Sequence, residues 1–303
     1  MNTQRIIVVG GGYAGVMAAN RAAGRGADVT LVNASANFVE RIRLHEVAAA
    51  SRDSAEFPLA SLLNPEVELV VGWAGRIHAE ERTVVLADGR ALGYDHLVYA
   101  VGSTSPERSG STFGIASHLD ALALRAGLAE LEFGTVDVVG AGLTGVELAA
   151  EIASARPELL VRLQTRGQVG ASLGIAGGHG VQRRLERLGV KITEDERQDV
   201  LGGDADMTVM AAGFAVPTLA RDSGLPVSEL GQLLVGPDLV VPRIPDIVGA
   251  GDAVVVAGAS HLRMSCAAAL PQGAHAVDTI FDGPQPLNAG FMLQCVSLGR
   301  RDG

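Results

Sequence analysis

The chain contains 303 residues, of which 24 are Lys or Arg and 34 are Asp or Glu, so its formal charge is −10. Apolar residues make up 48% and charged residues 19%, which excludes a disordered chain. The 39 glycines do not recur at every third position, which excludes a collagen-like repeat. The acidic balance argues against a nucleic-acid partner, because such binding depends on Lys and Arg that neutralise phosphates. The length predicts two domains.

The sequence shows no segment typical of a signal peptide or of a membrane span. The N-terminal apolar run Ile6 to Val9 is short and ends in glycines, and the longest apolar stretch, Ile247 to Ser260, is interrupted by Asp252. The cysteines, Cys266 and Cys295, form no C-x-x-C pair, and the seven histidines show no metal-ligand spacing. We therefore expect a cytoplasmic protein without a metal site or a redox-active disulfide.

The first part of the chain has the pattern of a strand, a turn, a helix and a second strand. Arg5 to Val9 is a β-branched run, typical of a strand buried on both faces of a parallel sheet. Glycines interrupt it, and the alanine-rich segment Tyr13 to Ala23 predicts a helix that ends at Gly24 and Gly26. Asp28 to Val32 predicts the next strand.

The same unit recurs about 130 positions later, which indicates two nucleotide-binding units in one chain. Its strands are predicted at Thr135 to Val139 and Leu159 to Gln164, with the helix at Leu143 to Ser154 between them. Further expected elements are a hairpin at Thr83 to Tyr94, turning at Asp88-Gly89, and strands at His96 to Val101 and Asp246 to Ala250. We expect the chain to cross between domains at Ser103 to Gly114 and at Pro237 to Pro245.

Both units carry the glycine fingerprint of dinucleotide binding directly after the first strand. The first glycine permits the tight turn, the second admits a pyrophosphate to the backbone, and the third lets helix and strand pack closely. The phosphates then meet free N–H groups at the positive end of the helix. These glycines are Gly10, Gly12 and Gly15 in the first unit and Gly140, Gly142 and Gly145 in the second.

Neither unit has an acidic residue at the end of its second strand, where a carboxylate commonly accepts the ribose hydroxyls. The first unit has Asn33, whose amide oxygen still accepts a hydrogen bond without charge assistance. The second has Arg166, which can pair with a 2′-phosphate or simply be an exposed arginine. NADH and NADPH therefore both stay open as hydride donors.

These motifs and their order resemble the FAD- and NAD(P)-dependent pyridine nucleotide oxidoreductases with two dinucleotide-binding domains. The likeness is strongest to type II NADH dehydrogenase-like flavoproteins, and it rests on Val8 to Gly15, Tyr94 to Ser103, Val139 to Glu147 and Ile247 to Ala253. It implies an α/β fold of two Rossmann-like, three-layer domains, with the NAD(P) domain inserted in the FAD domain. The expected ranges are 1–105 and 237–290 for the FAD domain, 106–236 for the NAD(P) domain, and 291–303 for the start of a truncated C-terminal domain.

The resemblance also implies roles for particular residues. Asn33 would face the adenosine ribose, Ala74 would contact adenine through its backbone, and Asp252 would bind a ribityl or phosphate-linked oxygen. Glu147 would lie near the nicotinamide as the candidate catalytic residue, with a surface glutamate as the alternative. The implied FAD contacts are Gly10, Gly11, Gly12, Tyr13, Ala14, Gly15, Asn33, Arg41, Arg43, Ala74, Gly102, Gly251, Asp252, Cys266 and Ala267, and the NAD(P) contacts are Gly140, Gly142, Leu143, Thr144, Gly145, Arg166 and Gly213.

Two arginines, the predicted helix start and one histidine need separate interpretation. Arg41 and Arg43 can reach FAD or be solvated. Cys266 and Ala267 fall at a predicted helix start, whose N–H groups would stabilise negative charge on a reduced flavin. His45, near the first unit, is interpreted as a core or surface histidine rather than a catalytic one.

The implied activity is transfer of a hydride from NADH or NADPH to FAD and of electrons to an acceptor. A quinone is favoured by the resemblance alone. A ferredoxin or rubredoxin partner and a small biosynthetic substrate are the alternatives, and a non-catalytic flavin-binding regulatory protein is the alternative from another class. A homodimer is compatible with the sequence.

Overall fold

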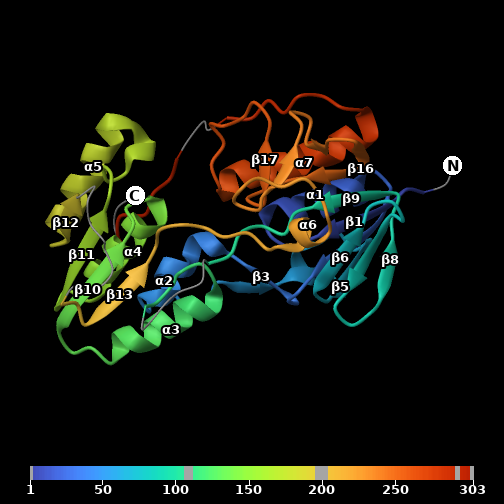
Figure 1. Cartoon of the computed structure of the whole chain (residues 1–303). Coiled ribbons are helices and arrows are strands. Elements are labelled where there is room, and N and C mark those ends of the chain that lie inside the picture. The colour runs from blue at the N-terminus through green and yellow to red at the C-terminus, as the bar shows by residue number, and fades with distance from the viewer. Residues whose placement is uncertain (1–2, 106–111, 195–203, 291–293, 301–303) are drawn as a thin grey trace. The chain divides into compact units, whose positions relative to one another are not determined.

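The computed structural model of the chain describes residues 3–105, 112–194, 204–290 and 294–300 (Figure 1). The chain folds into two compact units. The first comprises residues 1–38, 57–104 and 215–292, and the second comprises residues 39–56, 105–214 and 293–303. The chain leaves the first unit within β3 (Asn37–Val39) and returns to it within β4 (Glu56–Pro58).

The first unit is built on a mostly parallel sheet whose central strands contain short runs of Val, Ile and Leu. Such runs suit strands that are covered on both faces. The strand order is β15-β16-β9-β1-β2-β5, and only β15 runs antiparallel to its neighbour. The strands are β1 (Arg5–Val9), β2 (Asp28–Asn33), β5 (Val67–Val71), β9 (His96–Tyr99), β15 (Val240–Val241) and β16 (Ile244–Gly249).

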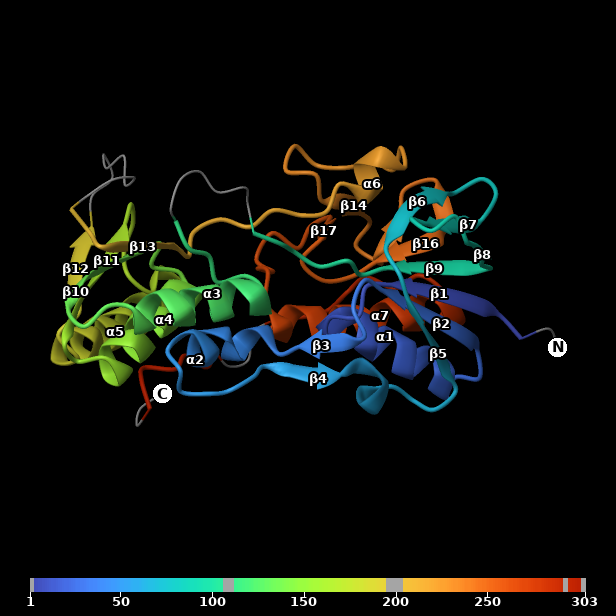
Figure 2. The ribbon, with the colours of Figure 1, turned by 90° about the horizontal axis from the view of Figure 1, so that it is seen from below.

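Helices α1 (Tyr13–Gly24) and α7 (Cys266–Asp282) pack together on one face of this sheet, as Figure 2 shows. A Cβ at Gly273 would lie 2.2 Å from the carbonyl oxygen of Ala14, so only glycine permits this close approach of the two helices. The other face carries the antiparallel strands β6 to β8 and the pair β14–β17. These smaller elements are β6 (Ala74–His78), β7 (Thr83–Leu86), β8 (Ala91–Gly93), β14 (Leu233–Val235), β17 (Val254–Val256), α6 (Leu219–Asp222) and η2 (Leu59–Leu62).

The second unit contains a four-stranded parallel sheet in the order β12-β11-β10-β13. Its apolar core joins the sheet to α4, α5, α3 and α2, with Val138, Val146, Ile152 and Leu163 fully buried. The elements are β10 (Gly134–Val139), β11 (Leu159–Thr165), β12 (Lys191–Glu194), β13 (Met207–Met210), α2 (Leu44–Ala48), α3 (His118–Ala129), α4 (Leu143–Ala155), α5 (Gly174–Arg187), η1 (Arg41–Arg43) and η3 (Ala171–Leu173).

The compact units differ from the expected domain ranges in three places. Residues 294–300, expected at the start of a further domain, belong to the second unit, whose core includes Val296. Residues 39–56 lie in the second unit, and residues 215–236 lie in the first, where Ser223 Oγ accepts a 2.9 Å hydrogen bond from the N–H of Ile77. The second crossing is therefore at Phe214 and Ala215, not at Pro237 to Pro245, because Val240 and Val241 of that segment pair with β16. Of the expected crossing at Ser103 to Gly114, residues 106–111 lie outside the described residues, as do 291–293 and 301–303 of the expected C-terminal start.

Within the described ranges, no helix combines the length and apolar character needed to cross a membrane.

Candidate functional site

Several of the predicted FAD contacts lie where four parallel strands of the first unit end. Val9 is aligned with Val32 on β2 and with Tyr99 on β9, and Tyr99 is aligned with Gly249 on β16. The carboxyl ends of these strands therefore lie at one edge of the sheet, which is where open α/β sheets bind ligands. Gly10, Asn33, Gly102, Gly251 and Asp252 follow directly at that edge.

Two of the three glycines of the first fingerprint, Gly10 and Gly15, are required by contacts within the fold. Gly10 has φ +107°, and a Cβ there would lie 2.2 Å from the carbonyl oxygen of Ala100. A Cβ at Gly15 would lie 1.8 Å from the carbonyl oxygen of Gly10, so the third glycine brings α1 onto the end of β1. Gly12 is different, because a Cβ there would meet no atom of the protein within 4 Å. Its backbone thus faces open space that a pyrophosphate would use.

The start of α1 has the form of a phosphate site. Its N-cap is Gly12, and no side chain caps it. By contrast, Ser117 caps α3 and Ser265 caps α7 through hydrogen bonds from Asp120 and Ala268. The N–H groups of Ala14 and Gly15 in the first turn of α1 therefore lie at the positive end of the helix dipole, where an anion would bind. These features fit the pyrophosphate of FAD.

Two further strand ends supply polar groups. Asp252 Oδ2 accepts a 2.7 Å hydrogen bond from Ser103 Oγ, which joins the segment after β16 to the segment after β9. The buried Gln272 of α7 accepts a 2.8 Å bond from the N–H of Gly251. A cavity of about 200 Å³ is lined by Gly251, Asp252 and Gln272, among others.

Asn33 has an unexpected partner. Its Oδ1 accepts a 2.8 Å hydrogen bond from the N–H of Gly11, and its Nδ2 donates to the carbonyl oxygen of Ser35 at 2.8 Å. Its backbone carbonyl accepts from Gly72, two residues before Ala74, the first residue of β6. The asparagine thus connects the glycine loop to β2 as well as facing the ligand edge.

The remaining predicted FAD residues are placed as follows. Ala14 is buried in α1, and a Cβ added at Gly251 would lie 3.2 Å from the Cβ of Ala14. The Tyr13 ring packs edge-on against Phe38 with centroids 5.1 Å apart. Cys266 and Ala267 begin α7, as the sequence predicts.

Arg41 and Arg43 belong to the second unit. Arg43 pairs there with Glu46 at 2.8 Å and with Glu40 at 3.7 Å.

The second unit repeats the same arrangement. Val139 of β10 is aligned with Gln164 of β11 and with Met210 of β13, so Gly140, Arg166 and Gly213 follow strands that end at one edge. A Cβ at Gly145 would lie 1.8 Å from the carbonyl oxygen of Gly140. Gly142 is the uncapped N-cap of α4, and it too faces open space. Leu143 and Thr144 supply the first N–H groups of α4, and Gly213 has φ +82°.

Glu194 is a residue of this edge that sequence reasoning missed. It ends β12 directly opposite Thr165, the residue before the exposed Arg166. Its Oε1 accepts a 3.0 Å hydrogen bond from the N–H of Val169. No sequence motif marks Glu194 as the end of a strand at this edge. Its position becomes clear only from the pairing of β12 with β11.

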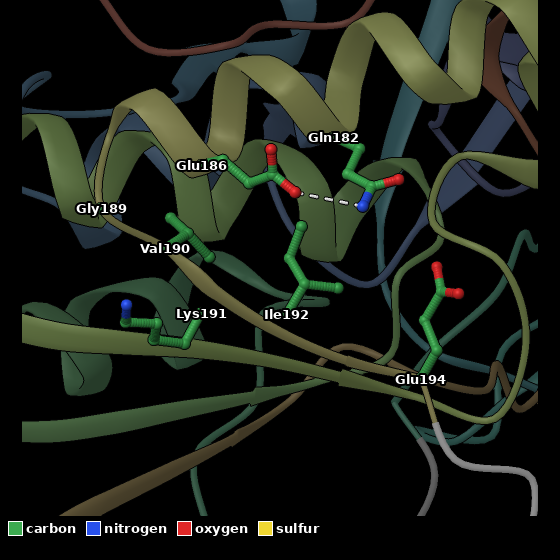
Figure 3. A pocket seen from close by; sticks show the side chains of 7 residues that line it. All are labelled: Gln182, Glu186, Gly189, Val190, Lys191, Ile192 and Glu194. Carbon is green, nitrogen blue, oxygen red and sulfur yellow. Dashed lines mark hydrogen bonds between the residues drawn. The ribbon is translucent and has the colours of Figure 1, made fainter.

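A cavity of the second unit contains none of the predicted residues. It has a volume of about 400 Å³ and lies between α5 and β12, where Gln182 Nε2 donates to Glu186 at 3.1 Å (Figure 3). Its lining includes the carboxylates of Glu186 and Glu194 and the side chain of Lys191.

Glu147 lies on α4, about one turn after Gly142. Its side chain is 19% exposed, and its Oε1 accepts a 3.1 Å hydrogen bond from the N–H of Ser297. Burial raises the pKa of this carboxyl to about 7. His45 of α2 is 4% exposed, and its Nδ1 lies 3.8 Å from Glu147 Oε2, so this histidine belongs to the core, as one interpretation of the sequence predicts.

Comparison with known proteins agrees with this geometry. Residues 4–273 match the family described as pyridine nucleotide-disulphide oxidoreductase. An NADH dehydrogenase-like protein of Mycobacterium tuberculosis is 29% identical, over 92% of this chain and 82% of that protein. A type II NADH:quinone oxidoreductase of the same species is 26% identical, over 84% and 68%. The crystal structure of NADH:rubredoxin oxidoreductase from Clostridium acetobutylicum superposes with a TM-score of 0.78 at 22% identity, over 98% and 80%.

Proposed function

Because this chain belongs to the pyridine nucleotide-disulphide oxidoreductase family and is an FAD-dependent NAD(P)H oxidoreductase, we propose that it delivers the electrons of NAD(P)H to a quinone. The observation that carries the proposal is the pair of uncapped helices, α1 and α4. Each begins with a glycine that faces open space at the carboxyl edge of its own parallel sheet. One chain thus offers two pyrophosphate sites.

The first unit holds FAD. The N–H groups at the start of α1 bind its pyrophosphate, and Asn33 lies at the strand end where the adenosine ribose belongs. Asp252, held by Ser103, would accept a hydrogen bond from a hydroxyl of the ribityl chain. FAD, when bound, supplies the hydride acceptor and the electron carrier of the reaction.

The second unit holds the nicotinamide nucleotide. The start of α4 binds the pyrophosphate, and Arg166 lies where an adenosine 2′-phosphate would be. Glu147, one turn into α4, accepts a hydrogen bond from the amide of the nicotinamide when its carboxyl is ionised. It thereby orients the ring, and the protein needs no general acid for the hydride step itself.

The quinone is favoured by the relatives, two of which are named as an NADH dehydrogenase-like protein and a type II NADH:quinone oxidoreductase. Cys266 and Cys295 form no disulfide, which supports an acceptor other than a disulfide. A rubredoxin-type protein is the second candidate, because an NADH-rubredoxin oxidoreductase of Clostridium acetobutylicum is 24% identical over 83% of this chain and 68% of that protein.

Stopped-flow absorbance of the FAD-loaded protein tests the reaction. We expect NADH or NADPH to bleach the oxidised flavin band of the wild type. Gly142→Ala should retain the bound flavin and lose bleaching rate by at least about tenfold at subsaturating nucleotide, because its methyl group fills the phosphate space. Gly180→Ala, in open space on α5 of the same unit, is the matched control. A wild type that binds no flavin, or is bleached by neither nucleotide, contradicts the proposal.

Reoxidation identifies the acceptor. The reduced protein is mixed in turn with a soluble quinone, a rubredoxin, a ferredoxin and dioxygen, and the return of the flavin band is timed. The quinone should act fastest. A faster reaction with either iron–sulfur protein would support the second candidate, and a reduced flavin that none of the four reoxidises would indicate a regulatory flavoprotein.

A further inference from the structure

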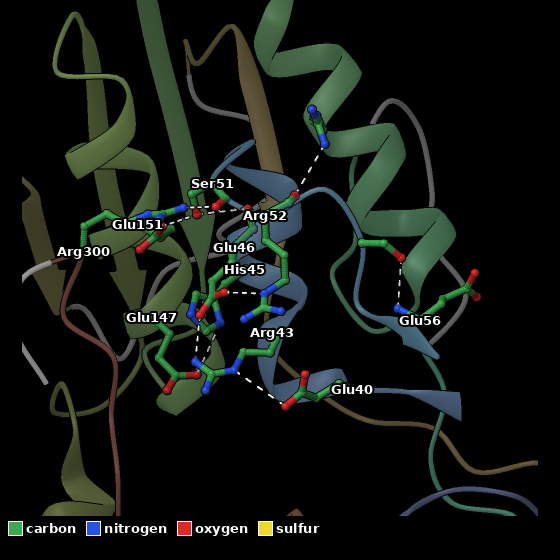
Figure 4. A network of polar contacts seen from close by, with 12 residues as sticks. Glu40, Arg43, His45, Glu46, Ser51, Arg52, Glu56, Glu147, Glu151 and Arg300 are labelled. Carbon is green, nitrogen blue, oxygen red and sulfur yellow. Dashed lines mark hydrogen bonds and ion pairs between the residues drawn. The ribbon is translucent and has the colours of Figure 1, made fainter. Parts of the chain in front are cut away.

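Helix α4 presents two glutamates to α2. Glu147 and Glu151 are four residues apart, so they lie on the same face of α4, and that face packs against α2 (Figure 4). Glu151 is 2% exposed, and its carboxylate pairs with Arg300 at 3.0 Å and accepts a hydrogen bond from Ser51. Its charge is therefore compensated by groups that do not bond to Glu147.

His45 is the side chain of α2 that faces Glu147. Nothing in the sequence around it predicts this contact, which depends on α2 belonging to the second unit. The distance of 3.8 Å from Nδ1 to Glu147 Oε2 is within ion-pair range and slightly beyond a hydrogen bond. Among the described residues, Nε2 of this buried ring has no hydrogen-bond partner.

This arrangement determines the protonation of the ring. Burial lowers the pKa of His45, so the ring is neutral at physiological pH. A positive ring would also bury a second N–H without an acceptor, at Nε2. In the neutral tautomer that carries its hydrogen on Nδ1, this N–H is directed toward Glu147. The atom without a partner is then Nε2, which has no hydrogen to donate.

The other charges around this pair are already engaged. Arg43 and Arg52 both bind the carboxylate of Glu46, at 2.8 Å and 2.6 Å. The backbone N–H of Ser297 donates a hydrogen bond to the other carboxylate oxygen of Glu147, Oε1. The titratable and charged groups that surround the pair are thus Arg43, Glu46 and Arg52 with α2, Glu151 on α4 and Arg300 near the C-terminus.

We propose that His45 is the positioning residue of Glu147, and that its Nδ1–H holds the carboxylate ionised and in place for the amide of the nicotinamide. This inference rests on the proposed function, in which Glu147 contacts that amide. Its consequence is that His45 sets the pH below which the nucleotide binds weakly, because a protonated Glu147 gives up its charge-assisted bond.

Three variants test the proposal. His45→Phe keeps the size of the ring and removes its nitrogens, whereas His45→Asn places an amide N–H where Nδ1 stands. His118→Phe is the matched control, because His118 is a largely buried histidine of the same unit that lies 4.0 Å from another carboxylate, that of Glu56. The pH dependence of KM and of kcat for NADH is measured for all three and for the wild type.

We expect KM to rise below a midpoint near neutral pH in the wild type. In His45→Phe this midpoint should move up by about one pH unit, while the kcat profile changes little, because the hydride step itself does not use the carboxylate. His45→Asn should return the midpoint most of the way, and His118→Phe should match the wild type. A midpoint that is the same in all four proteins overturns the proposal.

A second readout needs no turnover. Infrared difference titration of the holoprotein follows the carboxylic acid band that disappears in Glu147→Gln, and this band should titrate at higher pH in His45→Phe than in the wild type. If the band shifts but NADH neither binds nor bleaches the flavin, the proposed function fails and the positioning role stands. If NADH reacts and the band titrates identically in His45→Phe and the wild type, the positioning role fails alone.

Discussion

The backbone N–H of Gly11 donates a 2.8 Å hydrogen bond to Oδ1 of Asn33, which ties the glycine loop to the end of β2. Many dinucleotide sites have a carboxylate at this strand end, and it binds the ribose. Here the amide oxygen already has a partner within the protein. Asn33 therefore organises the loop before any ligand arrives, and it can serve the ribose only by sharing or exchanging that bond.

Asn33→Ala should lower the stability of the apoprotein by about 1 kcal/mol and raise the Kd for FAD about tenfold, since the loop loses its anchor. Asn33→Asp should retain FAD affinity, because a carboxylate oxygen accepts the same N–H. Urea unfolding and flavin fluorescence quenching measure the two quantities. Asn20→Ala is the control, because Asn20 also bridges two backbone groups of the first unit, and FAD affinity should be unchanged there. Equal loss of FAD affinity in both variants would refute the role of the asparagine.

Gly12 and Gly15 should separate ligand binding from folding. In Gly15→Ala the methyl group meets the carbonyl oxygen of Gly10, so we expect a loss of about 3 kcal/mol in the free energy of unfolding, or no folded protein. Gly12→Ala has room for its methyl group and should keep the melting temperature of the apoprotein, yet lose most FAD affinity. Calorimetry and flavin content after gel filtration measure both effects. Normal flavin content in Gly12→Ala would mean that the pyrophosphate does not use this space.

Glu147 should make stability depend on pH in an unusual direction. Its pKa rises from 4.5 to about 7 on folding, so between these values the folded protein binds more protons than the unfolded chain. Stability contributed by this group is therefore lost as the pH rises through that window, and Glu147→Gln should gain stability relative to the wild type, by at most about 3 kcal/mol above pH 7. Urea unfolding at pH 5 and pH 8 measures the difference.

Glu158→Gln provides a control of opposite sign. The Arg156 side chain, which donates a hydrogen bond to Glu158, lowers the pKa of this exposed carboxyl, so the variant should lose a little stability above pH 4. Identical pH responses of the two variants would show that Glu147 is not buried as described.

Arg166 should distinguish the two nicotinamide nucleotides. Arg166→Ala is expected to lower kcat/KM for NADPH about tenfold and to leave that for NADH nearly unchanged, because only NADPH has a 2′-phosphate for the guanidinium to bind. Arg187→Ala removes an exposed arginine of α5 in the same unit and serves as the control. Steady-state kinetics with both nucleotides decide the question, and an equal loss with NADH and NADPH would exclude a phosphate role.

Local signals were sufficient for the repeated elements of the fold. The sequence predicts the β-branched strand β1, the alanine-rich helix α1 and the glycine turn between them. The structure confirms these positions within one or two residues. The hairpin is also confirmed, with β7 and β8 joined through Gly89 at φ +88°. These elements are determined by neighbours in sequence, so a single sequence carries the information.

Contacts between distant segments could not be predicted. Arg162 of β11 binds the buried Asp137 of β10, and Gln164 binds the same carboxylate at 2.6 Å, although each residue looks ordinary in its own strand. Glu194 and His45 likewise acquire their neighbours only when β12 joins β11 and α2 joins α4. Burial and partner both depend on the tertiary fold, and no local pattern encodes either.

The packing of α1 against α7 has a consequence for how the protein is made. Arg21 of α1 binds Asp278 of α7, and Arg25, the residue directly after α1, binds Asp282; the two residues of each pair are 257 positions apart. The strand β9 similarly lacks its neighbour β16 until that later segment has been made. A nascent chain therefore holds an apolar α1 without its partner until α7 has left the ribosome, and we expect such slow closure to make this unit dependent on chaperones during synthesis.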